Sequence, residues 1–169
     1  VPLFVFMGVI LEKSGIAEEL LETMGRLFGR VRGGLAISVV AVGALLAATT
    51  GVVGASVVTM AVIALPAMLK HGYAPTLASG TIAASGTLGQ IIPPSIILIL
   101  LGDVIGVPVG QLFVAAAVPG MMLVFAYMLY IAFVAWRHPE LAPALKVDPN
   151  DEQLLFKVIK SLLPPLALV

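Results

Sequence analysis

The chain has 169 residues, of which 60% are hydrophobic and only 11% are charged, whereas about a quarter of the residues in a typical soluble domain carry a charge. Nine Lys and Arg residues balance nine Asp and Glu residues, so the chain lacks the basic excess that attracts nucleic acid. No cysteine is present and the two histidines lie far apart in sequence, which excludes disulfides and thiol chemistry and does not favour a haem or zinc site. The composition predicts a membrane protein.

Three long intervals without Asp, Glu, Lys or Arg indicate which parts of the chain lie at membrane depth, because a charge near the bilayer centre is costly. They cover residues 33–69, 71–102 and 104–136. The chain begins without Met and stops inside a further apolar run. We therefore expect a fragment of a longer protein, in which residues 1–11 are the end of a transmembrane helix.

Residues 12–32 predict an amphipathic arm helix that lies in the membrane interface. Apolar side chains recur there at helical spacing, opposite a face of Glu and Arg side chains. Ser14 is typical of a helix start, and Glu22, four residues before Arg26, predicts a surface ion pair. Because the charges recur along one face, we expect this helix not to cross the bilayer.

Residues 33–70 predict a re-entrant helical hairpin. The charge-free interval of 37 residues would form one helix about 55 Å long, too long for a single span, whereas two spans need about 40 residues and a turn. Glycine and hydroxyl residues at 49–56 favour a break in the backbone. We therefore expect two helical arms, residues 35–48 and 57–69, that enter and leave the membrane on the same side.

Residues 75–102 predict a transmembrane helix that is broken in its middle. The sequence G-Q-I-I-P-P-S at 89–95 interrupts it, because proline removes a backbone donor and clashes with the preceding turn. The expected halves are residues 76–88 and 96–101. Non-helical backbone at this depth is tolerated only where it is buried in protein or lines a polar cavity, and a simple kink at the Pro-Pro pair is the alternative.

Residues 112–136 predict a plain transmembrane helix, because the apolar run is long enough to cross a hydrocarbon core of about 30 Å. Its aromatic residues gather toward Arg137, as in an interfacial belt. Residues 137–152 are expected to form a cytoplasmic loop, and 153–169 an amphipathic stretch that leads into the next transmembrane segment.

This topology places every Lys and Arg residue on one side of the membrane. The loop at 102–111, which holds Asp103 and no basic residue, lies on the other side. The positive-inside rule therefore puts that loop outside the cell membrane.

The hairpin tip and the helix break form the candidate binding site. Freed backbone carbonyls and hydroxyls are the oxygen ligands that a dehydrated Na⁺ needs, and the N-termini of half-helices offer N–H groups to an anionic substrate. Small residues also let membrane helices pack closely, and that alternative stays open. The candidate residues are Thr49, Thr50, Gly51, Gly54 and Ser56 at the tip, and Ser85, Gly86, Gly89, Pro93, Pro94 and Ser95 at the break.

Catalysis inside the membrane is not expected. An intramembrane serine protease needs an activated Ser with a buried base, and an aspartyl protease needs two intramembrane Asp residues. The chain has no G-x-S-x-G motif. Asp103, which separates the second uncharged interval from the third, is the one acidic residue between residues 33 and 136. We therefore expect that the protein is not an enzyme and has no cofactor, and that Na⁺ is its coupling ion.

Several motifs together resemble the large membrane subunit of the tripartite ATP-independent periplasmic (TRAP) transporters. The resemblance covers about residues 2–123. It includes T-T-G-V-V-G-A-S at 49–56, M-x-x-x-G-Y at 68–73 and G-x-I-I-P-P-S at 89–95. The last of these, together with the M-x-x-x-G-Y motif upstream, is its most specific part.

The resemblance implies an all-helical, polytopic membrane protein with the elevator-type inverted-repeat fold of an ion transporter, of which one repeat is present. It implies Na⁺-coupled secondary import of a small organic acid across the bacterial inner membrane, with a small membrane subunit and a periplasmic substrate-binding protein as partners. The alternative is a passive channel or a non-transporting membrane scaffold subunit with the same broken-helix architecture. The residues implied for Na⁺ are Thr50, Gly51, Ser56, Pro93 and Ser95.

Overall fold

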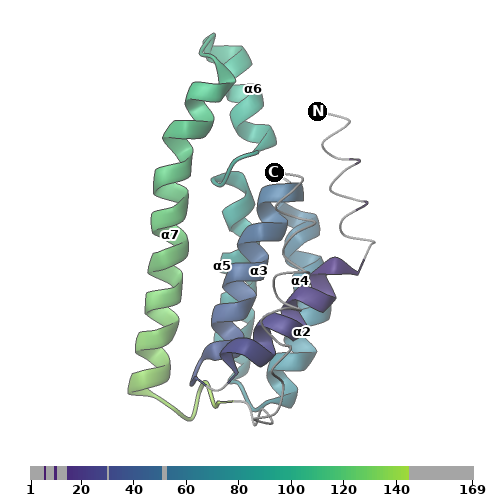
Figure 1. Cartoon of the computed structure of the whole chain (residues 1–169), viewed down its shortest axis with the longest axis vertical. Helices are drawn as coiled ribbons and strands as arrows, with labels where there is room; N and C mark the ends of the chain where they lie inside the picture. The colour runs from purple at the N-terminus through teal and green to yellow at the C-terminus, as the bar shows by residue number, and fades with distance from the viewer. Residues whose placement is uncertain (1–5, 7–9, 11–14, 30, 51–52, 145–169) are drawn as a thin grey trace.

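A computed structural model of the chain describes residues 6, 10, 15–29, 31–50 and 53–144, without the side chains of 16–18, 47–50 and 55. The described residues form helices and no strand (Figure 1), which confirms the predicted all-helical class. The helices are α2 (Ile16–Phe28), α3 (Gly34–Thr50), α4 (Val53–Lys70), α5 (Pro75–Thr87), the short 3₁₀ helix η1 (Leu88–Gln90), α6 (Ile96–Ile105) and α7 (Val109–Arg137).

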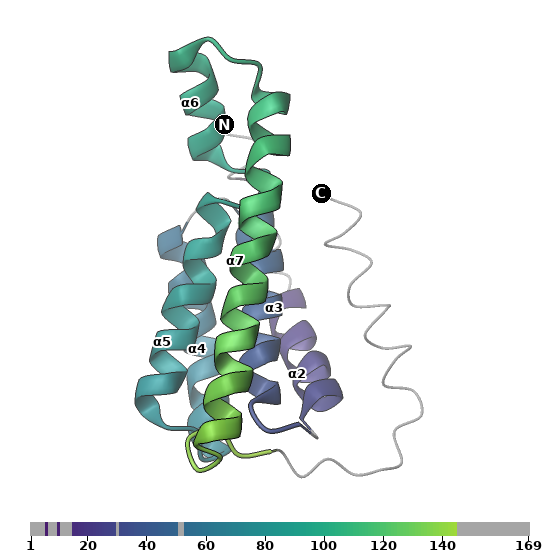
Figure 2. The same ribbon diagram turned by 90° about the vertical axis from the view of Figure 1, so that its left-hand side faces the viewer.

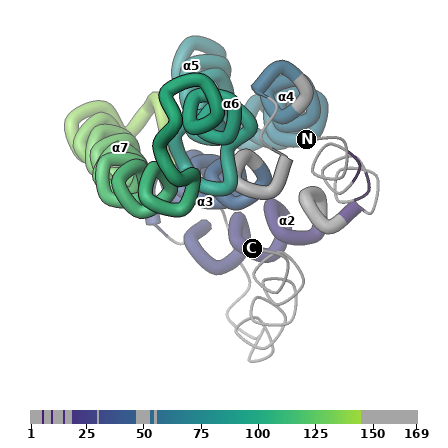
Figure 3. The backbone as a smooth tube through the Cα atoms, turned by 90° about the horizontal axis from the view of Figure 1, so that it is seen from above, coloured from purple at the N-terminus to yellow at the C-terminus, as the bar shows by residue number. Residues whose placement is uncertain are grey.

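Helix α3 lies in the middle of the bundle. Seen along the bundle axis, α2, α4, α5 and α7 are arranged around it (Figure 3), and all four pack against it. Its side chains Val39, Val40 and Val42 are buried, as expected of a helix that is apolar on every face. The predicted interval at membrane depth therefore supplies the centre of the core.

Helices α3 and α4 run antiparallel, and their outer ends, Gly34 and Lys70, lie at the same end of the bundle (Figures 1 and 2). The two helices extend into the segment at 49–56 where a break was predicted, because α3 continues to Thr50 and α4 already begins at Val53. Hydroxyl residues do not by themselves end a helix, since their side chains can bond to a carbonyl one turn back. Ser38 does so within α3, donating to the Gly34 carbonyl oxygen at 2.9 Å.

Helix α2 packs against α3 through one face. Leu20, Leu21 and Met24 are buried on that face, and the expected ion pair between Arg26 and Glu22 is present on the exposed face at 2.5 Å. The helix begins after Gly15, whose φ is +73°; the predicted start residue Ser14 lies outside the described residues. The predicted position of α2 in the membrane interface stays a prediction.

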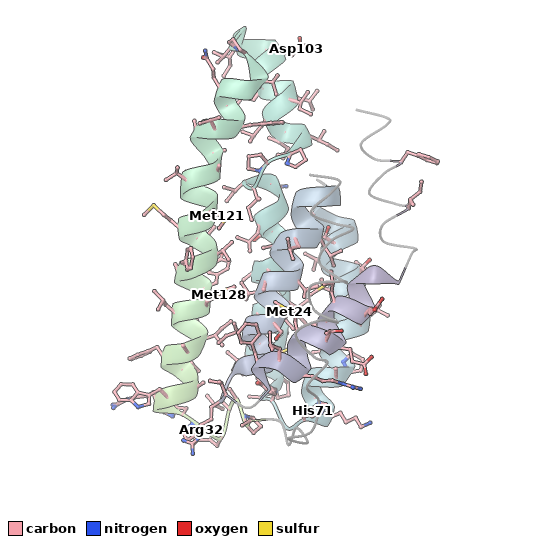
Figure 4. The ribbon with its side chains drawn as sticks, viewed as in Figure 1. Met24, Arg32, His71, Asp103, Met121 and Met128 are labelled. Carbon is pink, nitrogen blue, oxygen red and sulfur yellow. The ribbon has the colours of Figure 1, made fainter. Side chains whose placement is uncertain are left out.

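The loops at the lower end of Figure 1 are held together by backbone hydrogen bonds. After α7, the Ala142 carbonyl accepts from the Gly33 N–H and the Leu141 carbonyl accepts from the Ala74 N–H, both at 3.1 Å. Three loops that are far apart in sequence are therefore joined at this end. Arg32 and His71 lie there, and Asp103 lies at the opposite end (Figure 4).

Helix α7 is the one helix in the described part of the chain that is long and apolar enough to cross a membrane. Its 29 residues correspond to about 42 Å at about 1.5 Å per residue. The helix exceeds the predicted span of 112–136 at its start, because it begins directly after Pro108. Helix α6 also runs four residues beyond its predicted end, to Ile105, so the predicted loop at 102–111 shrinks to a turn around Gly106 with φ +73°.

Candidate functional site

The break between α5 and α6 lies at the same level as the tip of the hairpin formed by α3 and α4. Helix α5 passes into η1, and an extended Ser95 precedes α6. The segment η1 packs against α3 and also contacts α4 and α7. In two perpendicular views the break lies level with the ends of α3 and α4 (Figures 1 and 2). The structure thus brings the two predicted parts of the site to one level of the bundle.

Ser95 is buried and forms a hydrogen bond across the break. Its side chain is fully buried, and its hydroxyl donates a hydrogen bond to the Gln90 carbonyl oxygen at 2.8 Å. The Pro93–Pro94 peptide bond is cis, and neither proline has a backbone N–H to offer. The Ser95 hydroxyl therefore satisfies a carbonyl that the broken helix leaves free, while its own oxygen keeps its lone pairs.

Ser85 and Gly86 lie at close crossings of helices rather than in an open site. The Ser85 hydroxyl is buried and donates to the Ile82 carbonyl oxygen at 3.0 Å. A Cβ added to Gly43 of α3 would lie 2.7 Å from the Ser85 Cβ, and one added to Gly86 would collide with Val57 of α4. These two contacts match the close-packing alternative for small residues.

The candidate residues at the tip are described only in part. Ser56 is buried, and an added Cβ at Gly54 would meet nothing within 4 Å. The side chains of Thr49 and Thr50, and the whole of Gly51, lie outside the described residues. Gly89 is buried within η1. The assignment of all these residues to ion or substrate binding stays a prediction.

Two exposed polar residues stand beside the break, and neither was among the predicted site residues. Thr87 and Gln90 are exposed, three residues apart at the end of α5 and in η1. The Thr87 hydroxyl donates to the Ala84 carbonyl oxygen at 2.7 Å. Their polar character inside a charge-free interval could have identified them in the sequence. Whether they are exposed, however, depends on how the broken helix is rotated.

The electrostatics of the site are those of a neutral region. The described residues contain no cluster of three or more His, Cys, Asp or Glu side chains that could hold a metal. Burial raises the pKa of Tyr73, an effect that the nearby backbone amides of Leu35 and Ala36 partly offset. This residue lies in the turn between α4 and α5, away from the break.

A groove of about 590 Å³ opens between α5 and α7. Its lining is mostly apolar, with Leu77, Ile131 and Val134 among its residues, and none of the candidate site residues borders it. The groove is therefore separate from the tip and the break.

Comparison with known proteins gives a consistent result. The family model described as "Tripartite ATP-independent periplasmic transporter, DctM component" matches residues 1–169. The C4-dicarboxylate TRAP transporter large permease protein DctM of Pseudomonas aeruginosa is 36% identical over 80% of this chain and 32% of its own length. The ectoine TRAP transporter large permease protein TeaC of Halomonas elongata is 33% identical over 80% and 32%, respectively.

A further relative is the isethionate TRAP transporter permease protein DctMQ of Oleidesulfovibrio alaskensis, which is 30% identical over 77% of this chain and 20% of its own length. The chain spans about a third of the length of the first two relatives. These relatives are permeases of transporters and not enzymes, as expected from the sequence. The chain belongs to the DctM family of membrane permeases of the tripartite ATP-independent periplasmic transporters.

Proposed function

We propose that the whole protein imports a small organic acid across the bacterial inner membrane, driven by Na⁺, as the large permease subunit of a TRAP transporter. The observation that carries this proposal is the meeting of a helical hairpin tip and a broken helix at one level of the bundle. Paired breaks of this kind expose carbonyls and helix ends where transporters bind their ions and substrates. A relative named for C4-dicarboxylate supports an organic acid as the cargo.

The coupling ion is proposed to bind between the tip and the break. Na⁺ needs oxygen ligands that replace its water. Ser95 supports this role, because its buried hydroxyl uses its hydrogen on the Gln90 carbonyl and keeps lone pairs for a cation. The proposed ligands are Thr50, Gly51, Ser56, Pro93 and Ser95.

The hairpin and the broken helix are further proposed to move as one body in an elevator mechanism. Two close crossings support this, Gly43 against Ser85 and Gly86 against Val57, because close-packed helices resist sliding past each other. Helix α2, packed on α3, would link this body to a scaffold in the rest of the protein. A periplasmic substrate-binding protein and a small membrane subunit, separate or fused, are the proposed partners.

Uptake into liposomes by the full-length transporter with both partners tests the proposal. An inward Na⁺ gradient should drive accumulation of succinate, isethionate or ectoine above the external concentration. A Na⁺ ionophore should abolish that accumulation. A passive channel would instead equilibrate the solute with or without the gradient, and a scaffold subunit would move none of the three; either result contradicts the proposal.

A further inference from the structure

A contact between the break and helix α7 indicates how deep the break lies in the membrane. A Cβ added to Gly120 would lie 3.2 Å from Cγ1 of Ile92 and 3.5 Å from Cγ2 of Ile91. Gly120 is the twelfth of the 29 residues of α7, so it lies about 5 Å along the helix from the midpoint at about 1.5 Å per residue. Because α7 has the length and composition of a membrane span, the break lies close to the middle of the bilayer.

Gln90 is next to Ile91 and therefore lies at the same depth. Its side chain is exposed, and its carboxamide has no hydrogen-bond partner among the described residues, although its backbone carbonyl accepts from Ser95. A polar side chain that faces lipid at this depth is costly, so such residues face the protein interior or a water-filled cavity. The exposed side of η1 therefore faces the space enclosed by the rest of the protein.

The chemistry around Gln90 fits a carboxylate. No Lys or Arg lies between residues 71 and 136, so an organic acid bound at this level would find no cationic partner in this part of the chain. The carboxamide offers two N–H donors, whereas a hydroxyl offers one. The exposed hydroxyl of Thr87 already donates to Ala84, which leaves the Gln90 carboxamide as the available donor beside the break among the side chains that the structure describes.

We propose that the Gln90 carboxamide donates hydrogen bonds to the carboxylate of the transported acid and thereby sets the affinity of the transporter for it. This assignment rests on the proposed transport function and adds a substrate contact on the exposed side of the break. The buried hydroxyl of Ser95, on the inner side, serves the ion. The two roles predict different kinetic effects.

The test is uptake by the full-length transporter in liposomes, with its partners present and the acid supplied with an equimolar amount of its binding protein. The probe is whichever of succinate, isethionate and ectoine the unaltered transporter accumulates. Gln90→Ala should raise the concentration of the acid at half-maximal uptake about 10-fold or more, as expected for the loss of a hydrogen bond to a charged group. The concentration of Na⁺ at half-maximal uptake should stay within about twofold, since a single substrate contact is removed and no ion ligand.

Gln90→Glu should weaken uptake more than Gln90→Ala, because it places a like charge beside the carboxylate. Gln111→Ala is the matched control, since Gln111 is also exposed but lies in the first turn of α7, and it should change neither constant. Reduced abundance of Gln90→Ala with an unchanged constant for the acid would overturn the proposal in favour of packing against the rest of the protein. A raised Na⁺ requirement alone would overturn it in favour of an ion ligand, whereas failure of the unaltered transporter to accumulate any probe would instead overturn the transport function itself.

Discussion

Gly43 of α3 faces Ser85 of α5 so closely that a Cβ on Gly43 would lie 2.7 Å from the Ser85 Cβ and 2.8 Å from its Oγ. The two residues are 42 positions apart in sequence, and their contact joins an arm of the hairpin to the first half of the broken helix. Both are in the core, where neighbouring side chains have little room to move. The relative position of hairpin and break therefore depends on the absence of a side chain at residue 43.

Gly43→Ala should destabilise the protein by about 1–3 kcal/mol, the usual effect of overpacking a filled core. The loss should be visible as a lower melting temperature of the purified full-length protein. Adding Ser85→Gly should restore much of that stability, because it removes the two atoms nearest to the new methyl group. Equal melting temperatures of Gly43→Ala with and without Ser85→Gly would show that the two helices do not meet there.

The hairpin interpretation predicts the sidedness of three exposed positions. Arg32 and Lys70 flank α3 and α4, and Asp103 lies near the end of α6. Cysteines at 32 and 70 should react with an impermeant maleimide from the same side, and a cysteine at 103 from the opposite side, because a re-entrant pair returns the chain to its side of entry. The chain itself has no native cysteine, which simplifies the labelling; reaction of positions 32 and 70 from opposite sides would mean that the segment between them crosses the membrane.

Tyr73 predicts a loss of stability at alkaline pH. It is 2% exposed, and burial raises its pKa above the ordinary value of 10.0. The folded protein therefore holds the proton more tightly than the unfolded chain does, so this contribution to stability is complete below pH 10 and is lost as the pH rises through the raised pKa of the folded state. Between pH 9 and 11 the melting temperature should fall less for Tyr73→Phe than for the unaltered protein.

The Tyr73→Phe variant should melt at nearly the unaltered temperature at pH 7. The buried hydroxyl of Tyr73 completes no hydrogen bond with the described residues, and removal of an unsatisfied polar group costs little. If the melting temperatures of the two proteins fall in parallel as the pH rises, the alkaline sensitivity belongs to other groups.

The sequence predicted the order of the helices and the break because these depend on local features. A run of uncharged residues marks α7, and Pro93 and Pro94 cannot continue a helix. The extent of the tip was predicted less well, because Thr, Ser, Gly and Ala residues are compatible with a helix once neighbouring helices bury it. Thr50 and Val53 are therefore helical, although the glycine and hydroxyl residues of the segment 49–56 favoured a break there.

The close contact at Gly43 and the exposure of Gln90 could not be predicted from local sequence. The first depends on how α3 crosses α5, and the second on which way η1 turns after α5 ends. Both depend on tertiary packing between segments far apart in the chain. The same reason explains why Ser85 and Ser95, which look alike in sequence, differ in structure: Ser85 bonds within its own helix, and Ser95 bonds across the break.

Binding of Na⁺ between the tip and the break should be visible in the Na⁺ dependence of uptake by the Ser95→Ala variant. The variant is measured in the full-length transporter, normalised to protein in the membrane, beside Thr50→Ala and Ser56→Ala. Ser79→Ala is the control, since its exposed hydroxyl bonds to the Pro75 carbonyl oxygen in the first turn of α5. We expect a clearly higher Na⁺ concentration for half-maximal uptake in Ser95→Ala at near-normal abundance, because alanine cannot replace an oxygen ligand, whereas a hydroxyl lost from a membrane packing surface costs only about 0.6 kcal/mol. Na⁺ curves that match those of the unaltered transporter in all three variants would show that these three hydroxyls do not bind Na⁺.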